Sequence, residues 1–271
     1  MKKPKISIIT PNYNYGQFIG QAIESVLNQD YENIEHIIVD DGSTDNSVEI
    51  ISKYVEKYPD KIKLIQQTNR GQSSAINAGL MRVKGEIIGW LNSDDLYCMD
   101  IFKQIVDEFN RKQHIDIIYG DLVIMDKNGK IAKKIRQLPM DKTVGVFKGF
   151  GKLVASNTVF WRAILTERIG YFNEAFVCNM DGEYFSRLFY AGKSKHINKC
   201  LASFRVHPLS NSSNSNPDKM KRYYFELDYE LRKSYSNLLI SRFIPYEMSF
   251  PIKLLYGMRR VFMRYTKGYY F

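Results

Sequence analysis

Two pairs of adjacent aspartates each follow a short apolar run of the sequence. The pairs are Asp40-Asp41, after Ile34–Val39, and Asp94-Asp95, after Ile87–Leu91. A short apolar run followed by turn residues predicts a buried strand, and acids at the carboxyl ends of strands in an open α/β sheet face the crevice where ligands bind. Adjacent acids are costly to hold together unless a cation or hydroxyl groups meet them. The pattern therefore predicts a crevice suited to a divalent metal that carries a nucleotide diphosphate.

Helix capping is the competing interpretation of both pairs. Ser43, Thr44 and Asp45 are good caps for the next helix, but capping does not explain two acids at the strand tip. The second pair could be a solvated strand end that leads into the following helix.

Polar residues and an aromatic ring follow the first predicted strand, at Thr10, Pro11 and Tyr13. No G-x-G-x-x-G pattern and no P-loop follows this strand, which argues against a Gly-rich phosphate loop. An aromatic ring at a strand end can hold a flat base, and an ordinary turn is the alternative.

Three other residues, Arg70, Asp181 and His207, are weak candidates for a functional site when each is considered alone. Arg70, in a Gly-containing turn before a predicted helix, could receive anionic oxygens, although capping by Ser73 explains the turn equally well. Asp181, also before a predicted helix, could be a general base or an N-cap. His207 is a lone histidine, which is more often structural than a ligand.

Alternating strands and helices must position these residues. The first half predicts strands at Ile6–Thr10, Ile34–Val39, Lys63–Gln66, Ile87–Leu91 and Asp116–Tyr119. Between them it predicts helices at Ile19–Asn28, Ser47–Tyr58, Ser73–Val83 and Asp100–Arg111. Strict alternation predicts an α/β fold with a mostly parallel sheet covered on both faces.

The second half has a different pattern. It predicts a hairpin of Leu122–Met125 and Lys130–Ile135, followed by a loop over Gln137–Lys152. A strand is predicted at Thr158–Trp161 and a helix at Gly182–Ala191. Lys195–Arg205 is predicted to hold one or two short strands, and Pro208–Pro217 a loop.

Composition limits the class of protein. The chain has 271 residues, of which 44% are hydrophobic, and no run is long enough to span a bilayer. The N-terminus lacks an apolar signal-peptide core, and the three cysteines match no zinc or redox spacing. We therefore expect a cytoplasmic protein with reduced thiols.

The net charge of +10 is concentrated in the C-terminal tail. Residues 219–271 hold 11 Lys and Arg against 4 Asp and Glu, together with 14 of the 37 aromatic residues. The tail is predicted to be helical and amphipathic, with interruptions at Pro245 and Pro251. Such a tail suits peripheral contact with the inner face of the cytoplasmic membrane. Packing on the main domain and a homodimer contact are alternatives, and nucleic-acid binding is supported by charge alone.

In their order and spacing, these segments resemble the family 2 glycosyltransferases over about residues 4–210. The resemblance is carried by Ser7–Asn14, Val39–Asp45, Gly89–Asp95, and Ile169–Glu174 followed by Met180-Asp181. It implies the GT-A fold, a Rossmann-like mostly parallel sheet flanked by helices. We expect this domain over residues 1–215, with a nucleotide-sugar half to about residue 120 and an acceptor half after it. Residues 216–271 would form a basic, aromatic-rich helical extension.

The implied activity is transfer of a sugar, with inversion, from a UDP-, GDP- or dTDP-sugar to a glycan or lipid-linked glycan. The implied process is the assembly of a bacterial surface polysaccharide, such as lipopolysaccharide or capsule. By resemblance, Pro11 and Tyr13, next to Thr10, would line the base pocket. Asp41 would bond the base, and Arg70 would contribute to nucleotide-sugar binding.

The resemblance also assigns the metal and the chemistry. Asp94 would contact the ribose or sugar, and Asp95 would bind Mn²⁺ or Mg²⁺ at the diphosphate. Asp181 would be the catalytic base, and His207 is a further candidate for the metal or diphosphate. The chain departs from the family at Asn92, where many members have the first acid of Asp-x-Asp, and at Ser74, where an acid is common.

Three other functions were weighed. A nucleotidyltransferase would show a Gly-rich basic loop where this chain has Tyr13–Gly16, and a phosphatase would need a nucleophilic Asp where it has Thr10-Pro11. A non-catalytic nucleotide-sugar or carbohydrate-binding protein stays open if Asp181 or the metal site does not function.

Overall fold

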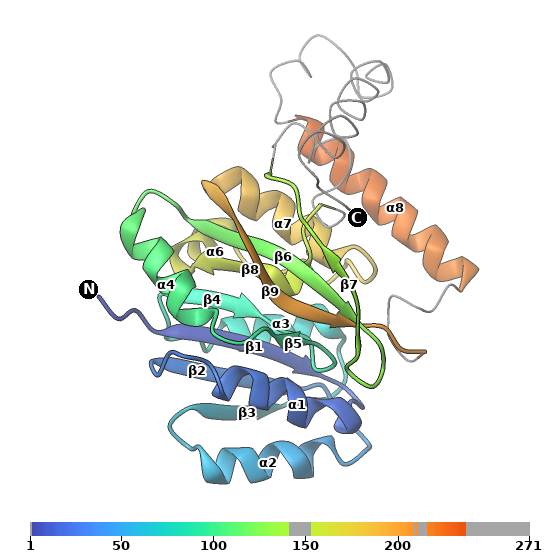
Figure 1. Ribbon diagram of the computed structural model, residues 1–271. Coiled ribbons are helices and arrows are strands. Elements are labelled where there is room, and N and C mark those ends of the chain that lie inside the picture. Colours follow the sequence, from blue (N-terminus) through green and yellow to red (C-terminus); the bar gives the residue numbers. More distant parts are fainter. Residues whose placement is uncertain (1, 141–152, 209, 211–215, 237–271) are drawn as a thin grey trace.

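A curled β-sheet forms the centre of the protein, with helices on both faces, in the computed structural model (Figure 1). The structure describes residues 2–140, 153–208, 210 and 216–236. The strands are β1 (Ile6–Asn12), β2 (Ile34–Asp40), β3 (Ile62–Gln66), β4 (Ile87–Trp90), β5 (Leu96–Tyr97), β6 (Ile117–Met125), β7 (Ile131–Ile135), β8 (Val159–Arg162) and β9 (Ser194–Arg205). The helices are α1 (Gly16–Leu27), α2 (Ser47–Lys57), α3 (Gln72–Leu80), α4 (Phe102–Arg111), α6 (Ala163–Ile169), α7 (Met180–Ala191) and α8 (Pro217–Ser236), with a 3₁₀ turn at Ser156–Thr158.

The strand order is β3-β2-β1-β4-β8-β6-β9-β5, and β7 pairs with β6. The first four strands in this order are parallel, as the sequence predicts. The sheet becomes mixed where β8 lies antiparallel between β4 and β6, while β9 is again parallel to β6. In register, Asn12 of β1 lies beside Asp40 of β2, so the two polar segments predicted to follow these strands meet at one edge of the sheet.

The helices cover the two faces of the sheet because strand side chains alternate between them. Ile6 and Ile8 of β1 belong to a core cluster with α1 and α4, whereas Ile9 belongs to a cluster with α3, α6 and α7 on the other face. Figure 1 shows the same separation, with α1, α2 and α4 on one side of the sheet and α3, α6 and α7 on the other.

The sequence-based element boundaries differ from the structure mainly in the second half. Strand β6 is continuous where two separate strands were predicted around Gly120, because a glycine in an apolar run reads as a break. In the structure, Gly120 allows β9 to approach β6 closely, since a Cβ on Gly120 would lie 2.5 Å from the carbonyl oxygen of Lys199 on β9. The short helix α6 was not predicted, and most of the predicted loop Gln137–Lys152 lies outside the described residues.

The described part of the tail is the helix α8, which packs along α7 (Figure 1). Its Leu227 and Tyr235 are buried, so packing on the main domain, one of the alternatives given for the tail, holds for residues 217–236. In the described part of the chain, none of the helices combines the length and the hydropathy needed to cross a lipid bilayer. The predicted interruptions at Pro245 and Pro251 lie outside the described residues, and membrane contact stays a prediction.

Candidate active site

A cavity of about 680 Å³ opens at the carboxyl ends of β1, β2 and β4. Six of the nine candidate residues line it: Pro11, Tyr13, Asp41, Arg70, Asp94 and Asp181. The other three, Thr10, Asp95 and His207, are not among the described residues at its wall. The cavity is thus shared by the strand ends of the first half, the N-terminal part of α7, and the first turns of α8.

Asp41 is buried at one end of the cavity and holds the loop between β3 and α3. Its Oδ1 accepts hydrogen bonds from Gln67 Nε2 at 2.7 Å and from the backbone N–H of Arg70 at 2.9 Å. Its Oδ2 accepts one from the N–H of Gly71 at 2.8 Å, where φ is +88° and glycine is therefore favoured. A carboxylate has about four lone-pair sites, and the described residues supply three donors, so one acceptor position of Asp41 remains for a ligand.

Asp94 and His207 form a close pair next to the cavity. Asp94 Oδ2 lies 3.0 Å from His207 Nε2, and both side chains are largely buried. The imidazole of His207 packs against Phe18 at 4.7 Å and edge-on against Tyr15 at 5.8 Å between ring centroids. Burial, Asp94 and Asp95 raise the pKa of Tyr15 to about 12. Tyr15 therefore stays neutral beside these acids and shields the pair from water on one side.

Asp95 lies behind Asp94, inside the protein. It has no exposed surface, and its oxygens accept hydrogen bonds from the backbone N–H of Arg205 at 3.0 Å and from the side-chain amides of Asn92 and Asn157 at 3.2 and 3.1 Å. Burial, and then the neighbouring Asp94, raise the pKa of Asp95 well above its usual range. This position does not favour the sequence-based choice of Asp95, rather than Asp94, as the metal ligand.

Arg205 fixes the turn that carries the two acids. Its guanidinium donates to the Asp94 carbonyl at 2.8 Å, to the Lys127 carbonyl at 3.0 Å and to Gln21 Oε1 at 2.7 Å, and it stacks over Phe18. Only 1% of the residue is exposed. One side chain therefore joins β9, α1 and the β6–β7 hairpin to the aspartate turn.

Arg205→Ala is expected to lower the free energy of unfolding by about 3 kcal/mol, since it removes a buried cation and leaves its acceptors without partners. Urea denaturation followed by circular dichroism measures this. Arg82→Ala, at an exposed arginine, is the matched control. A change in Arg205→Ala within the scatter of surface substitutions, about 0.5 kcal/mol, would contradict the role of Arg205.

Thr10 lies inside the sheet, away from the cavity. It is completely buried, and its hydroxyl is 2.8 Å from Nε2 of the buried His36 on β2. Burial alone lowers the pKa of His36 to about 3, so this is a neutral structural contact. The alternation of side chains along β1 brings Pro11 to the cavity but keeps Thr10 from it.

Asp181 lines the opposite side of the cavity, in the first turn of α7. Its side chain is half-buried, and the backbone N–H of Gly182 donates to its Oδ1 at 2.8 Å. Burial raises the pKa of Asp181, and the hydrogen bonds from the backbone offset this only in part. The result is a carboxylate that is more basic than a solvated one.

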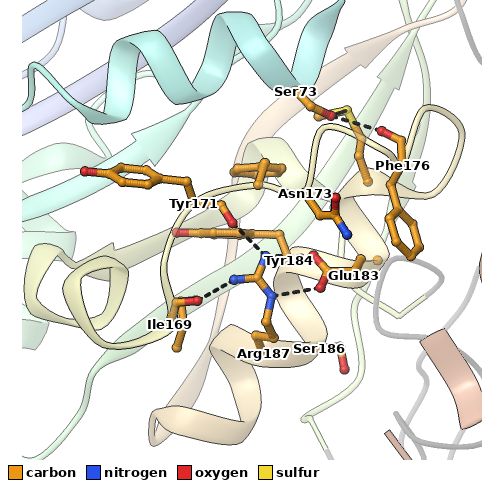
Figure 2. Close-up of polar contacts among 12 residues, drawn as sticks. Ser73, Ile169, Tyr171, Asn173, Phe176, Glu183, Tyr184, Ser186 and Arg187 are labelled. Atoms are coloured by element: carbon orange, nitrogen blue, oxygen red, sulfur yellow. Dashed lines mark hydrogen bonds and ion pairs between the residues drawn. The ribbon is translucent and has the colours of Figure 1, made fainter. Parts of the chain in front are cut away.

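Buried polar contacts hold α7 in place (Figure 2). Arg187 makes a two-pronged ion pair with Glu183 at 2.7 and 2.9 Å and donates to the carbonyls of Ile169 at 2.6 Å and Tyr171 at 2.8 Å. At the start of α3, Ser73 Oγ donates to the carbonyl of Phe176 at 3.1 Å. These bonds connect the segment before α7 both to α7 itself and to the start of α3.

Arg70 reaches across the rim of the cavity. It pairs with Glu174 at 3.4 Å, and the two side chains are 63% and 42% exposed. An ion pair this exposed contributes little to stability, so Arg70 is held loosely enough to turn toward an anionic ligand.

Sequence reasoning missed several residues of the site. Asn92, Tyr15, Lys219, Met220 and Tyr223 line the cavity without having been assigned a role. Tyr15 stands two positions after the selected Tyr13, which was a usable signal. The contribution of α8 could not be read from the sequence, because it depends on how the tail folds back.

Comparisons with known proteins identify the family of the chain. Residues 7–168 match the model of Glycosyl transferase family 2. An uncharacterized glycosyltransferase of Nostoc is 33% identical over 213 residues, which are 76% of this chain and 66% of that protein. The chain thus spans about two thirds of the length of this relative.

Solved structures show the same fold. TarS of S. aureus in complex with UDP-GlcNAc superposes with a TM-score of 0.66 at 22% identity, over 87% of this chain and 67% of that one. A mannosyltransferase of Pyrobaculum calidifontis in complex with GDP-Man and Mn²⁺ gives a TM-score of 0.60 at 17% identity, over 98% and 82%. The expected GT-A-like fold is confirmed, and because the family model matches more than half of its length, the chain belongs to the family 2 glycosyltransferases.

Proposed function

We propose that this protein transfers a sugar from a nucleotide-diphosphate sugar to an acceptor hydroxyl, with inversion at the anomeric carbon. One observation carries the proposal: Asp41, Asp94 and Asp181 come from three distant segments and line the same cavity. An acid for the nucleoside, an acid for the diphosphate region and a base for the acceptor are the groups this reaction needs.

The nucleoside would bind at the end of the cavity formed by Pro11, Tyr13 and Asp41. The free acceptor position of Asp41 suits an N–H of a base, and the ring of Tyr13 is 43% exposed and offers a flat contact. The solved neighbours bind UDP-GlcNAc and GDP-Man, which supports a nucleotide-sugar donor without deciding which one.

Asp94 and His207 fit a divalent cation. Asp94 Oδ2 and His207 Nε2 lie 3.0 Å apart, and this carboxylate oxygen and imidazole nitrogen would hold Mn²⁺ or Mg²⁺. His207 Nδ1 is also buried without a hydrogen-bond partner among the described residues, so rotation of the ring could present either nitrogen.

No group of three or more His, Cys, Asp or Glu side chains surrounds a common point in the described ranges. The donor diphosphate and water would therefore complete the coordination, as is usual for Mg²⁺ and chemically similar Mn²⁺.

In the reaction, the acceptor oxygen attacks the anomeric carbon from the face opposite the diphosphate. The bond from this carbon to the diphosphate oxygen breaks, and its electron pair leaves with the nucleoside diphosphate. Asp181 accepts the proton of the acceptor hydroxyl. When bound, the metal would stabilise the negative charge that develops on the leaving group.

The pH dependence follows from the burial of Asp181. A base must be deprotonated to act, and the pKa of Asp181 is raised, so activity should be lost on acidification at a higher pH than an ordinary aspartate would give. A profile of kcat/KM against pH checks this. If kcat/KM falls only at or below the pKa of a solvated aspartate, about 3.9, the assignment of Asp181 as the base is contradicted.

A donor panel tests the function itself. UDP-, GDP- and dTDP-sugars are incubated with the protein and Mn²⁺, with and without a chelator, and release of nucleoside diphosphate is measured. We expect turnover with one donor and its loss on chelation. Donor binding without turnover under any condition would favour the non-catalytic sugar-binding alternative. The acceptor, a homodimer and membrane contact stay predictions.

A further inference from the structure

A glutamate of α8 holds the backbone segment that directly precedes α7. Oε2 of Glu226 accepts hydrogen bonds from the N–H groups of Cys178 and Asn179, both at 2.8 Å, and its Oε1 accepts one from Val177 at 3.0 Å. Three consecutive backbone donors thus share one carboxylate. Only 5% of Glu226 is exposed, so these are buried, charge-assisted bonds.

These donors are groups that need an external acceptor. The first N–H groups of a helix and of the chain entering it have no partner within the helix, and no side-chain N-cap bond is made at Asn179. The positive end of the α7 dipole also favours an anion at this place. Burial raises the pKa of Glu226, but the hydrogen bonds from the backbone and from Arg222 outweigh it, and the pKa is lowered. Glu226 is therefore ionised.

A second acid of α8 acts on the same segment one turn later. Glu230 is 2% exposed, and its Oε2 accepts a hydrogen bond from Asn179 Nδ2 at 2.8 Å. The close approach depends on Gly182, since a Cβ there would lie 2.8 Å from the same oxygen of Glu230 and 2.5 Å from Asn179 Oδ1.

The segment held in this way forms part of the cavity. Val177, Cys178 and Asn179 line its wall, and Asp181 follows two residues later. From α8 itself, Tyr223 lies close to Asp181: burial, then the charges of Asp181 and Glu230, raise the pKa of Tyr223 to about 12. The same helix therefore both bounds the site and fixes the backbone that presents the base.

We propose that Glu226 is a positioning residue for Asp181, so that α8 is part of the catalytic unit and not only an appendage. Glu230 assists through Asn179. The proposal rests on the function proposed above, since it concerns the placement of the base in that reaction.

Glu226→Gln tests it. Glutamine has the same size, but its NH₂ replaces one of the two accepting oxygens. Either Val177 N–H and Arg222, or the N–H groups of Cys178 and Asn179, therefore lose their acceptor. We expect kcat to fall about tenfold or more, because a misplacement of about 1 Å can cost about a hundredfold in rate. The affinity for the nucleoside diphosphate should be unchanged, since Asp41 and Asp94 are untouched.

Asp228→Asn is the matched control. It removes an acid from the same helix, at an exposed position where Asp228 pairs with Arg232 at 2.6 Å. We expect it to leave kcat unchanged. Glu226→Asp keeps the charge and both oxygens and should recover part of the lost kcat, which loss of packing alone would not predict.

Hydrogen–deuterium exchange separates this proposal from the proposed function. The amides of residues 177–179 should be protected in the wild-type protein and in Asp228→Asn, and should exchange faster in Glu226→Gln. This measurement needs no substrate, so an inactive wild-type protein would refute the function while still testing the role of Glu226.

The proposal is overturned if folded Glu226→Gln shows wild-type exchange at residues 177–179, or shows faster exchange with an unchanged kcat in an active protein. If Glu226→Gln does not fold, Glu230→Gln, which removes the acceptor of the bond from Asn179 Nδ2, is measured in the same two ways. A wild-type result for both measurements in that variant would equally overturn it.

Discussion

Asp181→Asn is expected to lower kcat about a thousandfold while nucleotide affinity stays at the wild-type value. A positioned general base contributes about 10²–10⁴ to a rate, and an amide cannot accept the proton of the acceptor hydroxyl. The substitution is isosteric, and the hydrogen bond from Gly182 N–H can be made to the amide oxygen instead. The loss should therefore appear in turnover and not in binding or folding.

The measurement compares steady-state turnover with calorimetric binding of the nucleoside diphosphate, once the donor is known. Asp60→Asn, at an exposed aspartate in the turn between α2 and β3, is the control and should behave as wild type. A folded Asp181→Asn protein that transfers sugar at the wild-type rate would remove Asp181 from the mechanism, and the base would have to be sought elsewhere in the cavity.

The sequence predicted the layers of the fold well, for a local reason. The apolar runs that became β1, β2 and β4 are short and bounded by turn residues, and the helices between them are amphipathic, so each element can be identified without its neighbours. The second half was harder. β6 and β9 pair over their length with register shifts near Gly120 and Asp121, and such pairing is a property of two strands together.

The gathering of polar residues at the strand ends was also predictable, because residues at the ends of parallel strands meet at one edge of the sheet. Pro11, Tyr13, Asp41 and Asp94 do line one cavity. What the sequence could not decide is which of two adjacent carboxylates faces that cavity. For Asp94 and Asp95 this is decided by Arg205, 110 residues away, whose backbone N–H binds Asp95 and turns it inward.

The wall of the cavity near Asp181 depends even more on long-range contacts. Glu226 and Glu230 stand four positions apart in a tail that is otherwise basic, which marks one acidic face of a helix. The target of Glu226, the backbone 47 to 49 residues earlier, could not be inferred, because N–H groups carry no sequence signal. The tail was consequently interpreted through its exposed charge and aromatic rings and not through its buried acids.

Asp94→Asn is expected to weaken Mn²⁺ binding at least about a hundredfold, whereas Asp95→Asn should leave it nearly unchanged. Loss of an outer contact to a metal ligand already costs about 10–100-fold, and Asp94 is here the proposed ligand itself. Asp95 has no exposed surface and holds three protein donors. A metal could reach it only if those bonds were broken.

The two substitutions are a matched pair, since each replaces one acid of the same turn by its amide. In Asp95→Asn, Asn157 can supply an acceptor for the new NH₂ group. Asn157 Oδ1 is buried without a hydrogen-bond partner among the described residues, and a flip of the Asn157 amide would bring this oxygen to residue 95. That variant should therefore fold. Mn²⁺ titrations of turnover, and calorimetry with Mn²⁺ and the nucleoside diphosphate, provide the readouts. If Asp95→Asn removes metal dependence and Asp94→Asn does not, the metal belongs to Asp95 and the turn must rearrange when the donor binds.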